Sequence, residues 1–204
     1  MEQKEIEKLQ EKVRDRMTEK RFLHTVGVRY TACMLAMKYN VDLDRASIAG
    51  VLHDCAKCLS DERMLKECSD AHIPVSELEA RNPHLLHGKL GAYYAQTRYD
   101  IEDEEILSAI RCHTIGKPNM TTLEEILFVA DYIEPHRKPL TILPQIRQTA
   151  FTDLREAVYL IMKATLDYLT EVTTEGKGRL REIDPGTREA FAYYEQLHQH
   201  KEDI

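Results

Sequence analysis

The chain has 204 residues, of which 43% are hydrophobic and 31% charged, and its formal net charge is −7. This composition is typical of a globular protein with one sizeable core. The negative charge argues against a broad nucleic-acid surface, which needs clustered Lys and Arg. No apolar run approaches the roughly 18 residues of a membrane-spanning helix, and the charged N-terminus has no apolar segment of a secretory signal. We therefore expect a cytoplasmic protein that binds neither nucleic acid nor membrane.

Hydrophobic periodicity predicts helices along the whole chain and no strand of any length. The opening helix has apolar residues at three- and four-residue spacing, namely Ile6, Leu9, Val13 and Met17. Later helices are expected at about residues 19–39, 44–54, 85–99, 103–113, 123–133, 152–173 and 185–199. Residues 134–150 contain proline and are expected to be looser. The predicted fold class is all-α, with about nine helices in a bundle and a C-terminal helical extension.

Polar residues mark where several of these helices begin. Four of them are expected to be helix caps: Asp44, Ser60, Ser76 and Thr122. Ser76 and Thr122 are followed three residues later by Glu79 and Glu125, which is the spacing of a capping box. The prediction places one helix start at each of these positions.

Six residues could bind metal ions: His24, His53, Asp54, His87, His113 and Asp131. Each lies within or at the end of a predicted helix. A single histidine is more often a surface or core residue than a ligand, so the adjacent pair His53-Asp54 is the informative feature. Neighbouring helical residues point about 100° apart, so both can reach one ion only if it lies close to the helix. Asp54 has two carboxylate oxygens and could contact a second ion as well.

The order of these six residues resembles that of the HD-domain metallophosphohydrolases. Five segments strengthen the resemblance: RFLHTVGV, AGVLHDCAK, NPHLLHGKLGA, AIRCHTIGKPNM and FVADYIEPHR. Together they are similar to the YqeK-like branch, the bacterial symmetrical diadenosine tetraphosphate hydrolases. The resemblance is close over about residues 20–140 and weak in the tail, where Asp184 stands at a position often held by histidine.

The resemblance implies a dinuclear metal centre, usually described with iron. It implies that His24, His53, Asp54 and Asp131 hold one ion, and that His87 and His113 hold the other, with Asp54 bridging as the catalytic carboxylate. Imidazole and carboxylate ligands suit several first-row metals, so manganese, cobalt and other divalent ions stay open. The expected reaction is attack of a metal-activated water on phosphorus, which yields two ADP.

Four residues near the ligands are expected to bind the nucleotide substrate: Lys57, Thr114, Gly116 and Arg137. Lys57 lies one turn after His53, and Arg137 could grip a diphosphate with its two-pronged guanidinium. Tyr94 and Tyr132 could stack on a base, although a tyrosine in a helical stripe is more often part of the core.

The organisation is expected to be an N-terminal helix at 1–18, a core at 19–136 with every candidate ligand, and a C-terminal helical extension at 137–204 packed on the same core. The apolar face of residues 152–173 could be core or a homodimer interface. Cys55 and Cys58 form a C-x-x-C without the second pair of a structural zinc site, so free thiols are expected. Two alternatives stay open: another nucleotidase or dNTP phosphohydrolase of this architecture, or a non-catalytic nucleotide-sensing module.

Overall fold

The computed structural model describes residues 3–174 and 182–202, and these form eleven α-helices and one short 3-10 helix, without any strand. The helices are α1 (Gln3–Arg14), α2 (Glu19–Tyr39), α3 (Leu43–Leu52), α4 (Asp61–Asp70), α5 (Glu77–Arg81), the 3-10 helix η1 (Pro83–Leu86), α6 (His87–Tyr99), α7 (Glu104–Cys112), α8 (Thr122–Ile133), α9 (Leu143–Ala150), α10 (Leu154–Thr174) and α11 (Pro185–Glu202). The predicted all-α class is confirmed.

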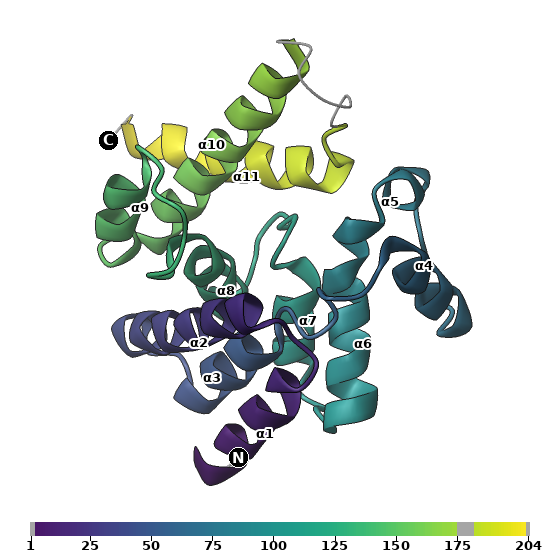
Figure 1. Cartoon of the computed structure of the whole chain (residues 1–204). Helices are drawn as coiled ribbons and strands as arrows, with labels where there is room; N and C mark the ends of the chain where they lie inside the picture. Colours follow the sequence, from purple (N-terminus) through teal and green to yellow (C-terminus); the bar gives the residue numbers. More distant parts are fainter. Residues whose placement is uncertain (1–2, 175–181, 203–204) are drawn as a thin grey trace.

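Helix α8 lies at the centre of the molecule, where it contacts α2, α3, α7, α9 and α10 (Figure 1). Nine of its residues are buried, including the polar Glu124 and Glu125. Helices α2 and α3 form the most extensive pair, and α6 packs on α7. Helices α10 and α11 cross at one end of the molecule, whereas α1 packs on α3 near the opposite end. This arrangement brings five helices, α2, α3, α6, α7 and α8, together around one interior point.

The C-terminal helices are joined to this core by buried contacts. Leu154, Val158 and Ile161 of α10 are at most 4% exposed, so this part of the apolar face of residues 152–173 packs inside the chain. Helix α11 is attached to α8 through Tyr194, whose hydroxyl donates to Glu125 at 2.8 Å.

Several predicted boundaries differ from the observed ones. The cap of α3 is Asp42 rather than Asp44, and the capping box of α8 is Thr121 with Glu124, one residue earlier than predicted. Adjacent threonines and adjacent glutamates make both registers plausible from sequence, and only the extended backbone of Thr121 selects one. Residues 134–150, which were expected to be looser, contain α9. The predicted count of about nine helices is too low, because short helices such as α5 and α9 lack a long periodic pattern.

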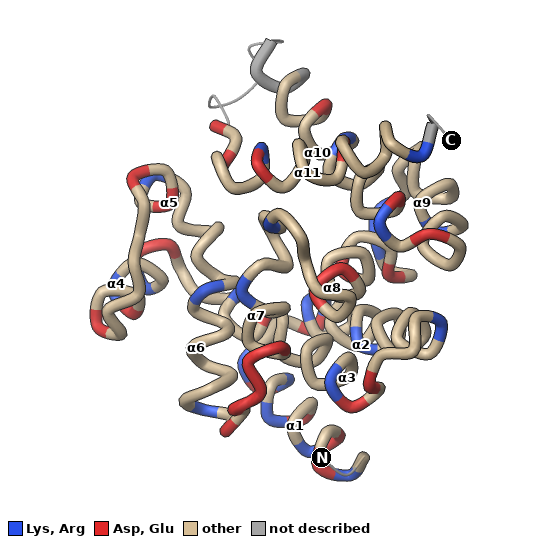
Figure 2. The backbone as a smooth tube through the Cα atoms, turned by 180° about the vertical axis from the view of Figure 1, so that it is seen from behind, with Lys and Arg blue, Asp and Glu red and all other residues tan. Residues whose placement is uncertain are grey.

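Other sequence predictions are confirmed. Ser60 caps α4, and Ser76 with Glu79 forms the capping box of α5. The five cysteines are free thiols, with Cys55 buried and Cys58 exposed. Lys and Arg are interspersed with Asp and Glu along the described helices, rather than gathered on one of them (Figure 2). None of the described helices combines the length and apolar character needed to cross a bilayer.

Candidate metal centre

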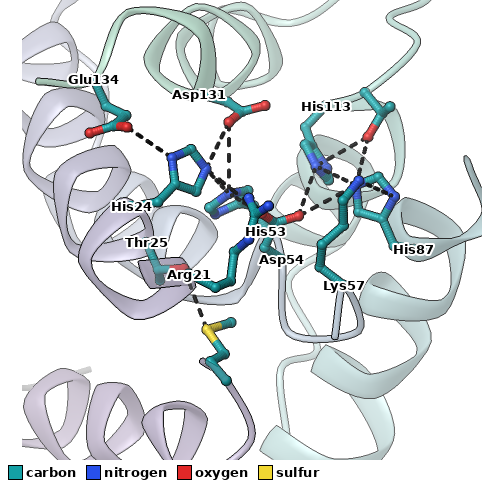
Figure 3. Close-up of polar contacts among 12 residues, drawn as sticks. Arg21, His24, Thr25, His53, Asp54, Lys57, His87, His113, Asp131 and Glu134 are labelled. Carbon is teal, nitrogen blue, oxygen red and sulfur yellow. Dashed lines mark hydrogen bonds and ion pairs between the residues drawn. The ribbon is translucent and has the colours of Figure 1, made fainter. Parts of the chain in front are cut away.

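The six candidate ligands converge from five helices (Figure 3). They are His24 in α2, His53 and Asp54 directly after α3, His87 at the start of α6, His113 directly after α7 and Asp131 in α8. Close packing of α6 on α7 is possible because Gly88 has no side chain, since a Cβ there would lie 2.8 Å from the carbonyl oxygen of Arg111. This close approach brings His87, at the start of α6, next to His113, which follows α7.

The donor atoms form two neighbouring triads. His24, His53 and Asp131 make one, and Asp54, His87 and His113 make the other, with the donor atoms of each triad within 4.8 Å of one another. Asp54 faces both triads, because its Oδ2 lies 3.2 Å from Nε2 of His53 and its Oδ1 lies 3.4 Å from Nε2 of His87. Ligand atoms that are each roughly 2.0–2.2 Å from one ion lie about 3–4 Å apart, so these spacings suit two ions that share Asp54.

Each imidazole is held in one tautomer by an oxygen at its Nδ1 atom. The Nδ1 atoms of His53, His87 and His113 donate to the backbone carbonyl three residues earlier, at 2.6–2.8 Å. Nδ1 of His24 donates instead to Oε1 of Glu134 at 3.0 Å. Carbonyl and carboxylate oxygens only accept, so all four protons are on Nδ1 and all four Nε2 lone pairs point inward.

The inward lone pairs need a positive partner. The Nε2 atoms of His24 and His53 are 3.3 Å apart, and those of His87 and His113 are 3.2 Å apart. Two unprotonated nitrogens cannot share a hydrogen bond, and burial lowers the pKa of His87 to about 3, which disfavours an added proton. A metal cation at each triad would satisfy these nitrogens, so the donor set fits the group that the family resemblance implies.

The two carboxylates are held in the ionised form that binds metals. Burial would raise the pKa of Asp54, but positive charge on the facing imidazoles of His53 and His113 outweighs it and holds that pKa well below its usual range. A bound cation would act in the same direction. Burial also opposes ionisation of Asp131, yet the charge of Arg137, whose guanidinium donates to Oδ1 at 2.6 Å, lowers its pKa. Neutral imidazoles beside charged carboxylates are the protonation states that ligation requires.

Three cations lie around the centre. Arg21 donates to Oδ2 of Asp54 at 2.7 Å, and Arg137 donates to Oδ1 of Asp131 at 2.6 Å. The ammonium of Lys57 lies 3.2 Å from both ring nitrogens of His87, and burial lowers its pKa. Sequence reasoning identified Lys57 and Arg137 but missed Arg21, which is three residues before His24 and therefore on the same side of α2.

The remaining predicted substrate residues differ in their surroundings. The hydroxyl of Thr114 lies 2.9 Å from Nε2 of His87 and is part of the centre. Gly116 has a φ of 70°, and a Cβ there would lie 2.5 Å from Cε of Met162 in α10. Backbone conformation and packing thus explain this glycine, and its contact with substrate stays a prediction.

The two tyrosines considered for base stacking are not alike. Tyr94 is 3% exposed, and the guanidinium of Arg98 lies 3.4 Å from the centre of its ring. It therefore belongs to the core, as the alternative interpretation expected. Tyr132 is half-buried on α8, next to Asp131, and its stacking role stays a prediction.

Sequence reasoning also missed Glu134. It is 1% exposed, lies three residues after Asp131 and follows the end of α8. Its three-residue spacing from Asp131 was the one sequence feature that could have drawn attention to it. The sequence does not indicate that its partner is His24, 110 positions away.

Comparison with known proteins defines the class to which this fold and centre belong. Residues 21–136 match the family model of the HD domain, so the chain belongs to the HD-domain family. The resemblance drawn from the five sequence segments is confirmed.

Individual relatives within the HD-domain family are similar to this chain over most of its length. The chain is 41% identical over 157 residues to a symmetrical bis(5'-nucleosyl)-tetraphosphatase of Bacillus subtilis, with 77% of this chain and 83% of that relative covered. A protein of the same name from Halalkalibacterium halodurans is 36% identical over 185 residues, with 91% and 92% covered. A crystal structure from Clostridium acetobutylicum, described as a predicted HD superfamily hydrolase involved in NAD metabolism, has a TM-score of 0.86 and 36% identity, and the match covers 94% of this chain and 97% of that one.

Proposed function

We propose that the chain is a symmetrical dinucleoside tetraphosphate hydrolase that converts diadenosine tetraphosphate and one water into two ADP. The observation that carries this proposal is the pair of triads that share Asp54 beside three cationic side chains. The relatives named bis(5'-nucleosyl)-tetraphosphatase support the choice of substrate. A buried centre with this donor chemistry and this charge suits a small anionic nucleotide.

The proposed centre holds two divalent metal ions. His24, His53 and Asp131 would hold one ion and His87 and His113 the other, and Asp54 lies between the two groups. Iron is the metal implied by the family resemblance, while manganese or cobalt also suit these ligands. When bound, the ions lower the pKa of a water and neutralise phosphate charge as it develops.

The protein's own residues bind and orient the polyphosphate. The guanidiniums of Arg21 and Arg137 neutralise Asp54 and Asp131, and metal ions would take over that neutralisation and release both groups for phosphate oxygens. Lys57 and Thr114 are beside the other triad. Positive groups thus lie on both sides of Asp54, as a polyphosphate cleaved at its centre requires.

The cleavage needs no dedicated proton donor. Water attacks one of the two central phosphorus atoms, the central P–O–P bond breaks, and its electron pair leaves on the β-phosphate of the second ADP. A diphosphate is already a stable anion, so it leaves without prior protonation. The oxygen of the water ends on only one of the two ADP molecules, which provides a direct readout.

The test is turnover of diadenosine tetraphosphate beside dATP, AMP and guanosine tetraphosphate, in water enriched with oxygen-18. We expect ADP as the sole product of the dinucleotide, with the label in half of the ADP molecules. Turnover of a mononucleotide without ADP from the dinucleotide would favour another HD-type phosphohydrolase. Equal, near-zero activity of the wild type and Asp54→Ala would favour a nucleotide-sensing module.

Two further properties belong to the proposal. The protein is expected to act in the cytoplasm, where its nucleotide substrate would be found. The homodimer stays a prediction, and light scattering at micromolar concentration would test it.

A further inference from the structure

The two triads differ in how their histidines are supported. His53, His87 and His113 each donate Nδ1–H to a backbone carbonyl. Only His24, among the four imidazoles, donates it to a carboxylate, that of Glu134 (Figure 3). A carboxylate on the far nitrogen of a histidine ligand fixes the ring and makes the inner nitrogen a stronger electron donor.

The Glu134 side chain is held rigidly. Its Oε1 accepts from His24, while its Oε2 accepts the backbone N–H of His136 at 2.6 Å and contacts the ring of the same residue at 3.2 Å. The side chain is 1% exposed. Both oxygens thus serve as acceptors, a condition that an amide in their place cannot meet.

The sequence of α2 leaves room for this carboxylate. A Cβ on Gly27 would overlap with Oε2 of Glu134 and would lie 3.2 Å from its Cδ. Alanine would otherwise be preferred over glycine inside a helix by about 1 kcal/mol. The absence of a side chain at Gly27 thus fits a need to keep Glu134 against His24.

The charge around the two triads is also unequal. The first triad has Asp131 as a ligand candidate and Glu134 behind it, in addition to the shared Asp54. The second triad has only the shared Asp54 as a carboxylate, and the ammonium of Lys57 lies 3.2 Å from its His87. Arg21 and Arg137 oppose the first triad, but their side chains are 31% and 39% exposed and can turn outward.

We propose that Glu134 is a positioning residue that fixes His24 and thereby makes the His24–His53–Asp131 position the tighter of two metal positions. The inference rests on the proposed metal centre. The first ion enters this position, and the position of Asp54, His87 and His113 fills second and exchanges more readily. Loss of such an outer carboxylate costs about 10- to 100-fold in metal affinity.

The main test is calorimetric titration of the metal-stripped, full-length chain with MnCl₂. The wild type is expected to bind in two steps of unequal affinity. His87→Gln should remove the weaker step and retain the tight one, which assigns the steps to the triads. Glu134→Gln should weaken the tight step about 10- to 100-fold and leave the weaker step within about twofold, because one amide oxygen cannot accept from both His24 and His136.

Two further variants separate positioning from general destabilisation. Glu125→Gln is the matched control, because Glu125, near the start of α8, is also a buried carboxylate and accepts from Tyr194. Both of its binding steps should match the wild type. Gly27→Ala, which alters no polar group, should reproduce the weakened tight step of Glu134→Gln.

The possible outcomes distinguish the two proposals. Unchanged titrations of Glu134→Gln and Gly27→Ala, or equal weakening of both steps, would overturn the role of Glu134 while leaving the hydrolase intact. A wild type that binds no Mn²⁺ would overturn the metal centre itself. If Glu134→Gln does not fold by circular dichroism, the titration of Gly27→Ala decides.

Discussion

The attachment of α11 to the core leads to a prediction that can be worked out from the structure. The Tyr194 hydroxyl, in a side chain that is 1% exposed, donates to Glu125, which is 3% exposed. In Tyr194→Phe the carboxylate keeps, among the residues that the structure describes, the ion pair with Arg155 at 3.4 Å, from a side chain that is 55% exposed. A lost hydrogen bond to a charged group costs about 1.5–3 kcal/mol. For a chain of this size, Tm should fall by roughly 3–12 °C at pH 8.

The same substitution should have a pH-dependent cost. Burial raises the pKa of Glu125, and the Tyr194 hydrogen bond partly offsets that rise. A folded-state pKa above the unfolded value means that the native state holds the proton longer, so stability falls as pH rises through that window. Removal of the hydroxyl raises the folded pKa further. The cost of Tyr194→Phe should therefore be largest at pH 8 and shrink as the pH approaches 4.5, the ordinary value of a glutamate.

Thermal unfolding of the wild type and two variants at pH 5 and pH 8 provides the measurement. Tyr193→Phe is the matched control, because its neighbouring hydroxyl donates to Asn119 at the surface, where a loss should stay within about 0.5 kcal/mol. A single transition in all three proteins would also support packing of residues 137–204 on the same core. Equal losses for the two variants, or a loss at Tyr194 that does not depend on pH, would refute the buried carboxylate contact.

Further predictions concern the centre and its supporting loop. Asp54→Asn should lower hydrolysis by more than about 100-fold and reduce bound metal at both positions by elemental analysis, and full metal content would contradict its bridging role. Arg21→Met should lower kcat/KM for diadenosine tetraphosphate roughly 10- to 150-fold, the equivalent of one charge-assisted hydrogen bond, with metal content unchanged and Arg63→Met on α4 as the neutral control. Chelation should lower Tm. Added Mn²⁺ at about 100 times its Kd should raise the free energy of unfolding by about 2.7 kcal/mol, whereas an unchanged Tm would exclude a metal bound to the folded state. Gly116→Ala should destabilise the fold by about 1–3 kcal/mol because of its φ of 70° and its contact with Met162, and a stability equal to the wild type would show that the loop relaxes freely.

Local sequence information determined the helices and the identity of the candidate ligands. Helix α2 spans Glu19–Tyr39, as the predicted range of 19–39 has it, because the cap Thr18 and the left-handed Asn40 each act within one turn. The four histidines and two aspartates could also be recognised as candidate ligands from their order, because each lies within or at the end of a periodic, predicted helical segment. The substrate expectation came from five local segments, and the named relatives agree with it.

Tertiary structure alone decided which atoms meet. The packing of α2, α3 and α8 determines the contact of Arg21 with Asp54 and the pairing of Glu134 with His24. Periodicity fixes the face of a helix on which a residue lies, but not the residue that faces it from a helix far away in the chain. The need for glycine at Gly27 became evident for the same reason, since the space that it leaves is filled from α8's end, more than a hundred residues later.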